Sequence, residues 1–133
     1  MEVFPTVGLQ GETVRQVTAT DTAAVVGSGD QPVLATPTLL AWVENAAFAA
    51  VSSQLPDGMT TVGTRLDFRH LAATPVGMKV TACATLQEID GRRLTFWVEA
   101  RDERERIGDG RHERYIVPAE KFLAKAKMKI VAE

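Results

Sequence analysis

The sequence predicts an α+β fold in which an antiparallel sheet wraps around one long helix. The first observation behind this prediction is a single long apolar segment, residues 39–51. The second is a series of segments after it in which apolar and polar residues alternate, separated by turn-forming residues. One helix followed by a meander with one apolar face packs as two layers around a common core. The 133 residues suit one domain, spanning 1–133.

The helix is predicted to begin at Thr36-Pro37, with Thr36 as the N-cap and Pro37 at the first helical position. It should end before Pro56-Asp57-Gly58. Apolar residues occupy nearly all its sides, so we expect a helix buried all round. A loop over residues 27–32 precedes it.

Alternation of side-chain character predicts the strands. Two precede the helix and four follow it: residues 12–19, 23–26, 62–70, 78–86, 94–100 and 112–117. Asp90-Gly91 is a strong hairpin signal, and residues 108–110, Gly-Asp-Gly, are predicted to form another turn. The mixed charges of residues 101–106 suggest a solvated turn, and residues 120–128 suggest a short amphipathic helix.

Composition excludes several classes of partner. The net charge is −2 without a block of like charges, so nucleic acid is not expected to bind. The N-terminus does not resemble a signal peptide, and the longest apolar stretch is too short to span a bilayer. One cysteine, Cys83, excludes an internal disulfide, and two histidines without supporting ligands make a metal site unexpected. We therefore predict a cytoplasmic protein without a metal or a membrane segment.

Glu44 is the most informative residue, because it puts a carboxylate in an otherwise apolar helix. Removing an unpaired carboxylate from water costs roughly several kcal/mol in effect, so stability alone would favour an apolar residue there. Desolvation also makes a carboxylate a stronger base, which suits a general base or a nucleophile. The alternative is a glutamate that reaches solvent through a gap or bonds to a buried backbone group.

His70 and Thr36 are the next candidates. Val62, Thr64, Leu66, Phe68 and His70 are predicted to share one strand face, which points His70 toward the helix. A carboxylate–imidazole pair with Glu44 would suit proton transfer, whereas the plainer alternative is a histidine bonded to a backbone carbonyl. Thr36 either caps the helix or, with the free N–H groups there, holds a carbonyl or oxyanion. A direct Thr36–Glu44 contact is not expected, because eight helical residues span about 12 Å.

The chain resembles the fluoroacetyl-CoA thioesterase family of the hot-dog-fold superfamily over residues 33–127. The resemblance rests on several motifs in order and at matching spacing: Val33-Leu34-Ala35-Thr36, Val43-Glu44-Asn45-Ala46, Val62-Gly63-Thr64, residues 69–77, residues 90–94 and residues 107–114. It implies a homodimer, or a dimer of dimers, with active sites near the subunit interface. The family's catalytic Thr, Glu and His fall on Thr36, Glu44 and His70. Its acyl-site glycine falls on Gly63 and its pocket arginine on Arg114.

The resemblance implies hydrolysis of an acyl-CoA without a metal or redox cofactor, with CoA as part of substrate and product. Glu44 would act as nucleophile or as the base that activates water, His70 would assist proton transfer, and Thr36 would hold or attack the carbonyl. The fluoroacetyl-specific enzyme has phenylalanines as a lid in the loop before its threonine, whereas residues 27–31 contain no aromatic residue. We therefore expect a short or small acyl group without fluoroacetyl specificity.

Three other interpretations remain open on the sequence. The first is a non-catalytic acyl-CoA-binding or regulatory protein with the same fold, which would keep the pocket without turnover. The second is a hot-dog hydratase or dehydratase, although those enzymes usually pair an Asp with a His a few residues on in one segment, and this sequence has no such pair. The third is a structural dimer without a ligand, which would leave Glu44 unexplained.

Overall fold

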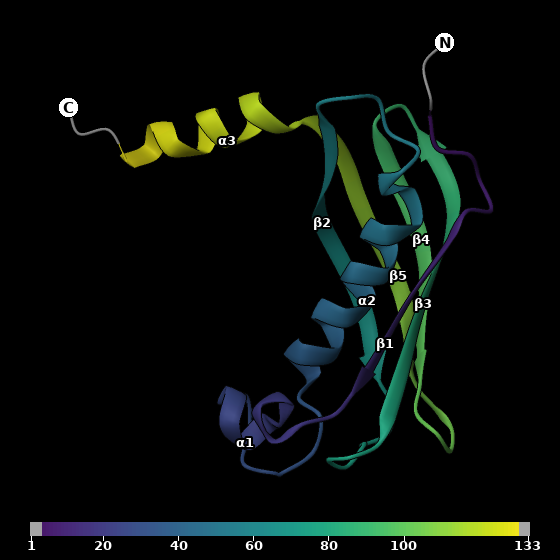
Figure 1. Ribbon diagram of the computed structural model, residues 1–133, viewed down its shortest axis with the longest axis vertical. Helices are drawn as coiled ribbons and strands as arrows, with labels where there is room; N and C mark the ends of the chain where they lie inside the picture. Colours follow the sequence, from purple (N-terminus) through teal and green to yellow (C-terminus); the bar gives the residue numbers. More distant parts are fainter. Residues whose placement is uncertain (1–3, 131–133) are drawn as a thin grey trace.

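A computed structural model describes residues 4–130 as a curled five-stranded antiparallel sheet packed against one long helix, α2 (Figure 1). The strand order is β1-β3-β4-β5-β2, which leaves β1 and β2 at the two edges. The main elements are α2 (Thr36–Ser52), β1 (Gln10–Gln16), β2 (Met59–His70), β3 (Lys79–Asp90), β4 (Arg93–Arg101) and β5 (Arg106–Pro118). The predicted α+β hot-dog plan is confirmed.

The core lies between α2 and the inner face of the sheet. Small residues on the helix let β1 come close: a Cβ added at Gly11 would collide with the carbonyl oxygen of Ala46 and lie 2.6 Å from the amide nitrogen of Ala50. Larger apolar side chains from α2 and the middle strands fill the remaining space. Leu39 and Val43 of α2 and Val80, Leu86, Leu94, Phe96 and Val98 of β3 and β4 are fully buried. The sheet therefore fixes both the position and the rotation of α2.

The expectation of a helix buried all round was wrong. One side of α2 is buried, but Ala41, Asn45, Phe48 and Ala49 are exposed and Glu44 is half-buried. The sheet curls around only one side of the helix, so the opposite side of α2 faces away from the core of this chain. Glu44 lies at the boundary between the two sides, which agrees with the alternative of a glutamate that reaches solvent.

Residues 23–26 form a short helix rather than the predicted strand. In α1 (Ala23–Val26) the hydroxyl of Thr22 accepts a hydrogen bond from the amide of Val25, and Gly27 ends the helix at a φ of 94°. A further turn of 3-10 helix, η1 (Ala19–Asp21), precedes it. The local capping signals of Thr22 and Gly27 outweigh the β propensity of two valines. The loop that follows, residues 27–32, is confirmed.

The predicted turn at residues 108–110 was also wrong, because these residues lie inside β5. Gly108 and Gly110 pair with His70 and Phe68 of β2, and a Cβ at Gly108 would lie 2.5 Å from the Phe68 ring. The glycines thus serve a close approach between strands rather than a turn. The actual turn follows β4, where the Asp102 carboxylate accepts hydrogen bonds from the amides of residues 104 and 105. That turn falls within the predicted solvated segment.

A β-bulge in β2 changes which residues face the helix. Gly63 pairs with Arg114 and Arg65 pairs with Glu113, so Thr64 is the extra residue. The alternation restarts there, and the inward face carries Gly63 and then Leu66 instead of Val62 and Thr64. The prediction was right for Leu66, Phe68 and His70, which lie after the bulge, and wrong for the two residues at and before it.

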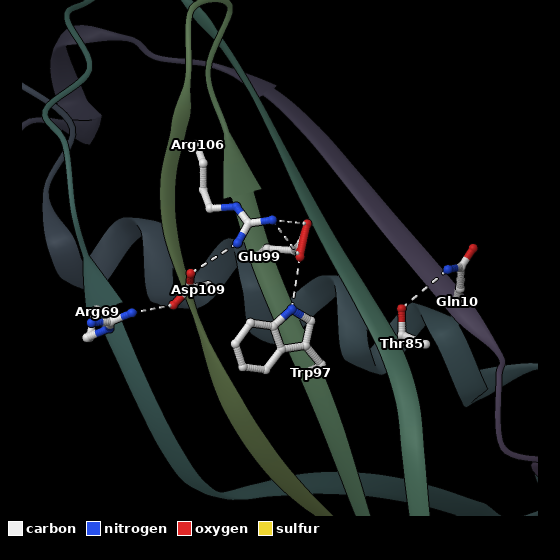
Figure 2. A network of polar contacts seen from close by, with 7 residues as sticks. All are labelled: Gln10, Arg69, Thr85, Trp97, Glu99, Arg106 and Asp109. Carbon is white, nitrogen blue, oxygen red and sulfur yellow. Dashed lines mark hydrogen bonds and ion pairs between the residues drawn. The ribbon is translucent and has the colours of Figure 1, made fainter.

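A polar network ties three strands together on the outward face of the sheet (Figure 2). Asp109 accepts from Arg106 and Arg69, at 3.2 and 3.4 Å, and Arg106 also bonds to Glu99. The indole Nε1 of Trp97 donates to Glu99 at 2.9 Å. This half-buried tryptophan therefore has its polar atom satisfied within the chain.

The C-terminal helix, α3 (Ala119–Lys127), extends away from the sheet past β2 (Figure 1) and confirms the amphipathic helix predicted there. Its apolar residues Phe122 and Leu123 are exposed, and a turn of 3-10 helix, η2 (Met128–Ile130), follows it. None of the helices within residues 4–130 has the length and apolar character needed to cross a membrane.

Candidate active site

Thr36 and His70 form a hydrogen-bonded pair at the N-terminus of α2. The Thr36 hydroxyl lies 2.7 Å from Nδ1 of His70. The N-cap of α2 is Ala35, so Thr36 is the first helical residue and not the predicted cap. The hydroxyl of a capping threonine would accept a hydrogen bond from a backbone N–H of the first turn. Because the helix is capped by Ala35, one residue before the predicted cap, the hydroxyl of Thr36 is available to bond to His70, the last residue of β2.

His70 combines a buried imidazole with an unused nitrogen. Its Nε2 is buried and has no hydrogen-bond partner within residues 4–130. Burial lowers the pKa of His70, and an interaction with the backbone of Ala72 opposes this shift only in part. The imidazole is therefore neutral at neutral pH. Thr36 and His70 line a cavity of about 350 Å³, together with Ser28 and Leu34.

Glu44 faces a second, open recess two turns along α2. Ala41, Glu44, Asn45, Phe48, Gly63 and Arg114 line this recess of about 300 Å³, called the Glu44 recess below. A Cβ added at Gly63 would lie 2.7 Å from Oε2 of Glu44, so only glycine leaves the carboxylate its place. Within residues 4–130, neither a hydrogen bond nor an ion pair holds this carboxylate. It is therefore free to meet a substrate or a water molecule.

Arg114 supplies a fixed positive charge to the same recess. The side chain is buried, with 7% of its surface exposed. Its Nε donates to the Thr61 hydroxyl at 2.8 Å, and Nη2 donates to the Thr61 carbonyl at 2.9 Å. Burial lowers the pKa of Arg114 and the nearby Glu44 raises it, but a guanidinium stays charged in either case. The guanidinium also lies 5.8 Å from the centre of the Phe48 ring.

The predicted residues thus form two groups in one chain. Thr36 and His70 are brought together, as are Glu44, Gly63 and Arg114. The predicted Glu44–His70 pair is not found among the contacts of the described residues. The two groups are separated by about the 12 Å that eight helical residues span. Each holds chemistry suited to a carbonyl substrate: a hydroxyl–imidazole pair in one, and a carboxylate beside a cation in the other.

His112, which was not among the residues predicted for the site, is the imidazole that lies near Glu44. A Cβ at Gly63 would be 3.2 Å from its Cε1, and Glu44 raises its pKa against the larger effect of burial. The sequence could have indicated an inward-facing His112, because His112, Arg114 and Ile116 are alternate residues and lie on the inward face of one strand. The predicted turn at residues 108–110 hid it, since it placed His112 at the start of a strand.

Comparisons with known proteins agree with this fold. The sequence profile of the fluoroacetyl-CoA-specific thioesterases matches residues 17–120. A fluoroacetyl-CoA thioesterase from Streptantibioticus cattleyicolor is 40% identical over 100 residues, which cover 75% of this chain and 72% of that protein.

Solved structures give the same picture. A variant of the fluoroacetyl-CoA-specific thioesterase FlK in complex with fluoroacetate and CoA is 32% identical, with a TM-score of 0.83 over 89% of this chain and 99% of that chain. A hot-dog-like protein from Thermanaerovibrio acidaminovorans, 24% identical, has a TM-score of 0.86 over 98% of this chain and 96% of that chain, a likeness of fold.

The fold and the similar proteins together identify the chain as a thioester hydrolase of the hot-dog superfamily. Within it, the chain belongs to the fluoroacetyl-CoA-specific thioesterase family.

Proposed function

We propose that the protein hydrolyses a short acyl-CoA thioester. The observation that carries this proposal is the Glu44 recess, where an unpaired carboxylate lies beside a glycine and a buried arginine. A thioester carbonyl that enters such a recess meets a base or nucleophile and a cation that stabilises developing negative charge. Membership of the thioesterase family, and the CoA bound to the FlK variant, support the same substrate class.

Each side chain has a proposed role. Glu44 attacks the carbonyl or takes a proton from the attacking water, and Arg114 and Gly63 bind the acyl end of the substrate. His70, neutral and hydrogen-bonded to Thr36, assists proton transfer to the leaving thiolate, and Thr36 holds or attacks the carbonyl. Water is consumed, the C–S bond breaks, and the products are a carboxylic acid and CoA. The chemistry needs no metal or redox group, and we propose that none takes part.

The two groups of residues suggest a site shared between subunits of a homodimer. β2 is an edge strand whose outer backbone groups pair with no other strand within residues 4–130. A second copy aligned antiparallel along β2 would bring the His70 end of one strand beside the half of the partner strand that carries glycine 63. We propose this dimer as the active form, and the proposal does not depend on whether two dimers pair into a tetramer.

The acyl group is proposed to be small and not specifically fluorinated. The preceding loop contributes Ser28 to the lining of the cavity beside Thr36, and none of the described residues that line this cavity is a phenylalanine. The loop before Thr36 therefore supplies no phenylalanine lid of the kind expected for contact with fluorine. We further propose that the protein acts in the cytoplasm, where its one cysteine, Cys83, stays reduced.

Release of free thiol from a panel of acyl-CoAs tests the function. Acetyl-, propionyl- and fluoroacetyl-CoA are expected to be hydrolysed with kcat/KM values within about tenfold of one another, because a pocket without specific contacts discriminates weakly. Palmitoyl-CoA is expected to be a poor substrate, and a chelator should change no rate. Binding of acyl-CoA by calorimetry without thiol release would instead identify a non-catalytic acyl-CoA-binding protein.

Gly63→Ala is expected to lower kcat/KM by about a hundredfold or more, because the added methyl group takes space that Oε2 of Glu44 occupies. Steady-state kinetics on acetyl-CoA would measure this effect. Gly29→Ala is the matched control, since its new methyl group would meet only Cβ of Ala23 at 3.5 Å, an ordinary contact. Equal activity of the two variants would contradict the proposed placement of the carboxylate.

A further inference from the structure

His112 has a contact with Arg114 that the proposed mechanism does not use. Nη1 of Arg114 lies 3.1 Å from Nε2 of His112, and both side chains are buried. Thr61 holds the other side of the guanidinium through its hydroxyl and its carbonyl. The arginine is thus gripped from two strands, with β2 supplying Thr61 and β5 supplying His112.

The partners of His112 define its protonation state. Its Nδ1 lies 2.8 Å from the carbonyl oxygen of Arg65, which can only accept, so Nδ1 carries the hydrogen. A guanidinium can only donate, so Nε2 must offer its lone pair to Nη1 of Arg114. Only the neutral Nδ1–H tautomer satisfies both contacts. An imidazolium would turn an N–H toward the N–H of the arginine and break the second one.

The surroundings favour this neutral form. Burial is the largest influence on the pKa of His112 and lowers it, and the positive charge of Arg114 lowers it further. The hydrogen bond to the Arg65 carbonyl and the charges of Glu44 and Glu113 act in the opposite direction but do not prevail. From the remaining side, β4, the ring of Phe96 lies 6.2 Å away and brings no charge.

We infer that His112 is a positioning residue, whose neutral Nε2 holds the Arg114 guanidinium beside Gly63 and Glu44 before the substrate arrives. An arginine side chain has many rotamers, so ordering it in advance removes an entropic cost from substrate binding. Nη1 lies 3.3 Å from the position of a Cβ at Gly63, on the border of the Glu44 recess. This role rests on the proposed function, because Arg114 is taken to bind the acyl end of the substrate.

Kinetics of two variants test the role. His112→Phe keeps the ring beside Phe96 but removes the acceptor, and it is expected to raise KM for acetyl-CoA about tenfold or more with a smaller change in kcat. His112→Gln puts an acceptor near the position of Nε2 and should recover most of the lost affinity. Thermal unfolding of both variants checks that the fold is intact. A phenylalanine variant with unchanged KM would overturn the inference.

A double-variant cycle separates positioning from general packing. In an Arg114→Met background, His112→Phe should add no further rise in KM, because the group that His112 positions is gone. Additive effects would overturn the inference, since they would show that His112 acts independently of Arg114. The single variant Thr61→Val, which removes the other side-chain anchor of Arg114, is expected to raise KM in the same direction.

The pH dependence gives a readout that packing alone would not move. Protonation of His112 releases Arg114, and burial lowers the pKa of His112 from its ordinary value of 6.5, so KM of the wild type should rise only at a pH below 6.5. The rise should be absent from His112→Phe. A wild-type KM that stays constant down to the unfolding pH would overturn the inference.

Nitrogen-15 NMR of the imidazoles reports the tautomer without any turnover. The chain has two histidines, so a His70→Asn variant assigns both signals. His112 is expected as the neutral Nδ1–H tautomer at pH 7, and an Nε2–H tautomer or an imidazolium would refute the inference. If the wild type hydrolysed no acyl-CoA, the proposed function would fail while the NMR result still decided the state of His112.

Discussion

Glu44→Gln is expected to lower kcat for acyl-CoA hydrolysis by about 10²- to 10⁴-fold or more, since 10²- to 10⁴-fold is the typical contribution of a general base. Glutamine matches glutamate in size, so the recess with Gly63 and Arg114 should keep its shape. Substrate binding should therefore survive, and the loss should lie in kcat rather than in KM. Thiol release at saturating acetyl-CoA measures the effect.

Glu120→Gln is the matched control, because it makes the same chemical change on α3, where the side chain is exposed. Its kcat should equal that of the wild type. If Glu44→Gln retains wild-type activity, Glu44 neither activates water nor attacks the carbonyl, and the mechanism proposed here is wrong.

Mixing Glu44→Gln with a second variant, Thr36→Ala, tests whether the site is shared between subunits. Thr36→Ala and Glu44→Gln are each expected to be nearly inactive alone. If Thr36 of one subunit works with the glutamate of its partner, mixed dimers regain one complete site of two, and random mixing restores about a quarter of wild-type activity. A site contained within one subunit would show no recovery on mixing.

Gly11→Ala is expected to have the largest effect on stability, a loss of about 3 kcal/mol in the free energy of unfolding. The new methyl group would collide with the Ala46 carbonyl and the backbone of Ala50, so the backbone of α2 or β1 has to move. Neither shifts easily, because β1 pairs with β3 along its whole length and α2 packs on the sheet. Urea denaturation measures the change as a lower midpoint at an unchanged m-value.

Gly29→Ala again serves as the control, since its backbone has no left-handed φ and its surroundings are open. Its free energy of unfolding should lie within about 0.5 kcal/mol of the wild type. Equal stability of the Gly11 and Gly29 variants would mean that the helix and β1 are further apart than the structure places them.

The fold could be predicted from the sequence because its strongest signals are local. A long apolar segment and alternating strands define α2 and the sheet, and Asp90-Gly91 forms the hairpin between β3 and β4, with Gly91 at a φ of 62°. Errors arose where a local signal has two meanings. The glycines at 108 and 110 were taken for a turn, yet they allow β5 to approach Phe68 of β2, a neighbour that no local pattern reveals.

The sequence could suggest candidate site residues, but not which of them lie together in the structure. Thr36 and His70 lie 34 residues apart, and their hydrogen bond depends on where α2 begins relative to the end of β2. The contacts of His112 could not be predicted for a related reason. They join its imidazole to the Arg65 carbonyl on β2 and to the guanidinium of Arg114, two residues along its own strand. Contacts of this kind arise from strand register, which the sequence alone leaves open.

The bulge at Thr64 shifts the inward and outward alternation of side chains in β2 by one residue. In a regular strand that ends at His70 as this one does, Thr64 would lie opposite Arg114, and its side chain would stand where Gly63 now faces Glu44. The extra residue changes which side chains face inward in the two halves of β2. In the later half His70 faces Thr36, and in the earlier half Gly63, which has no side chain, faces the carboxylate of Glu44. The spacing of the chain at a single position thus decides whether the recess is open or filled.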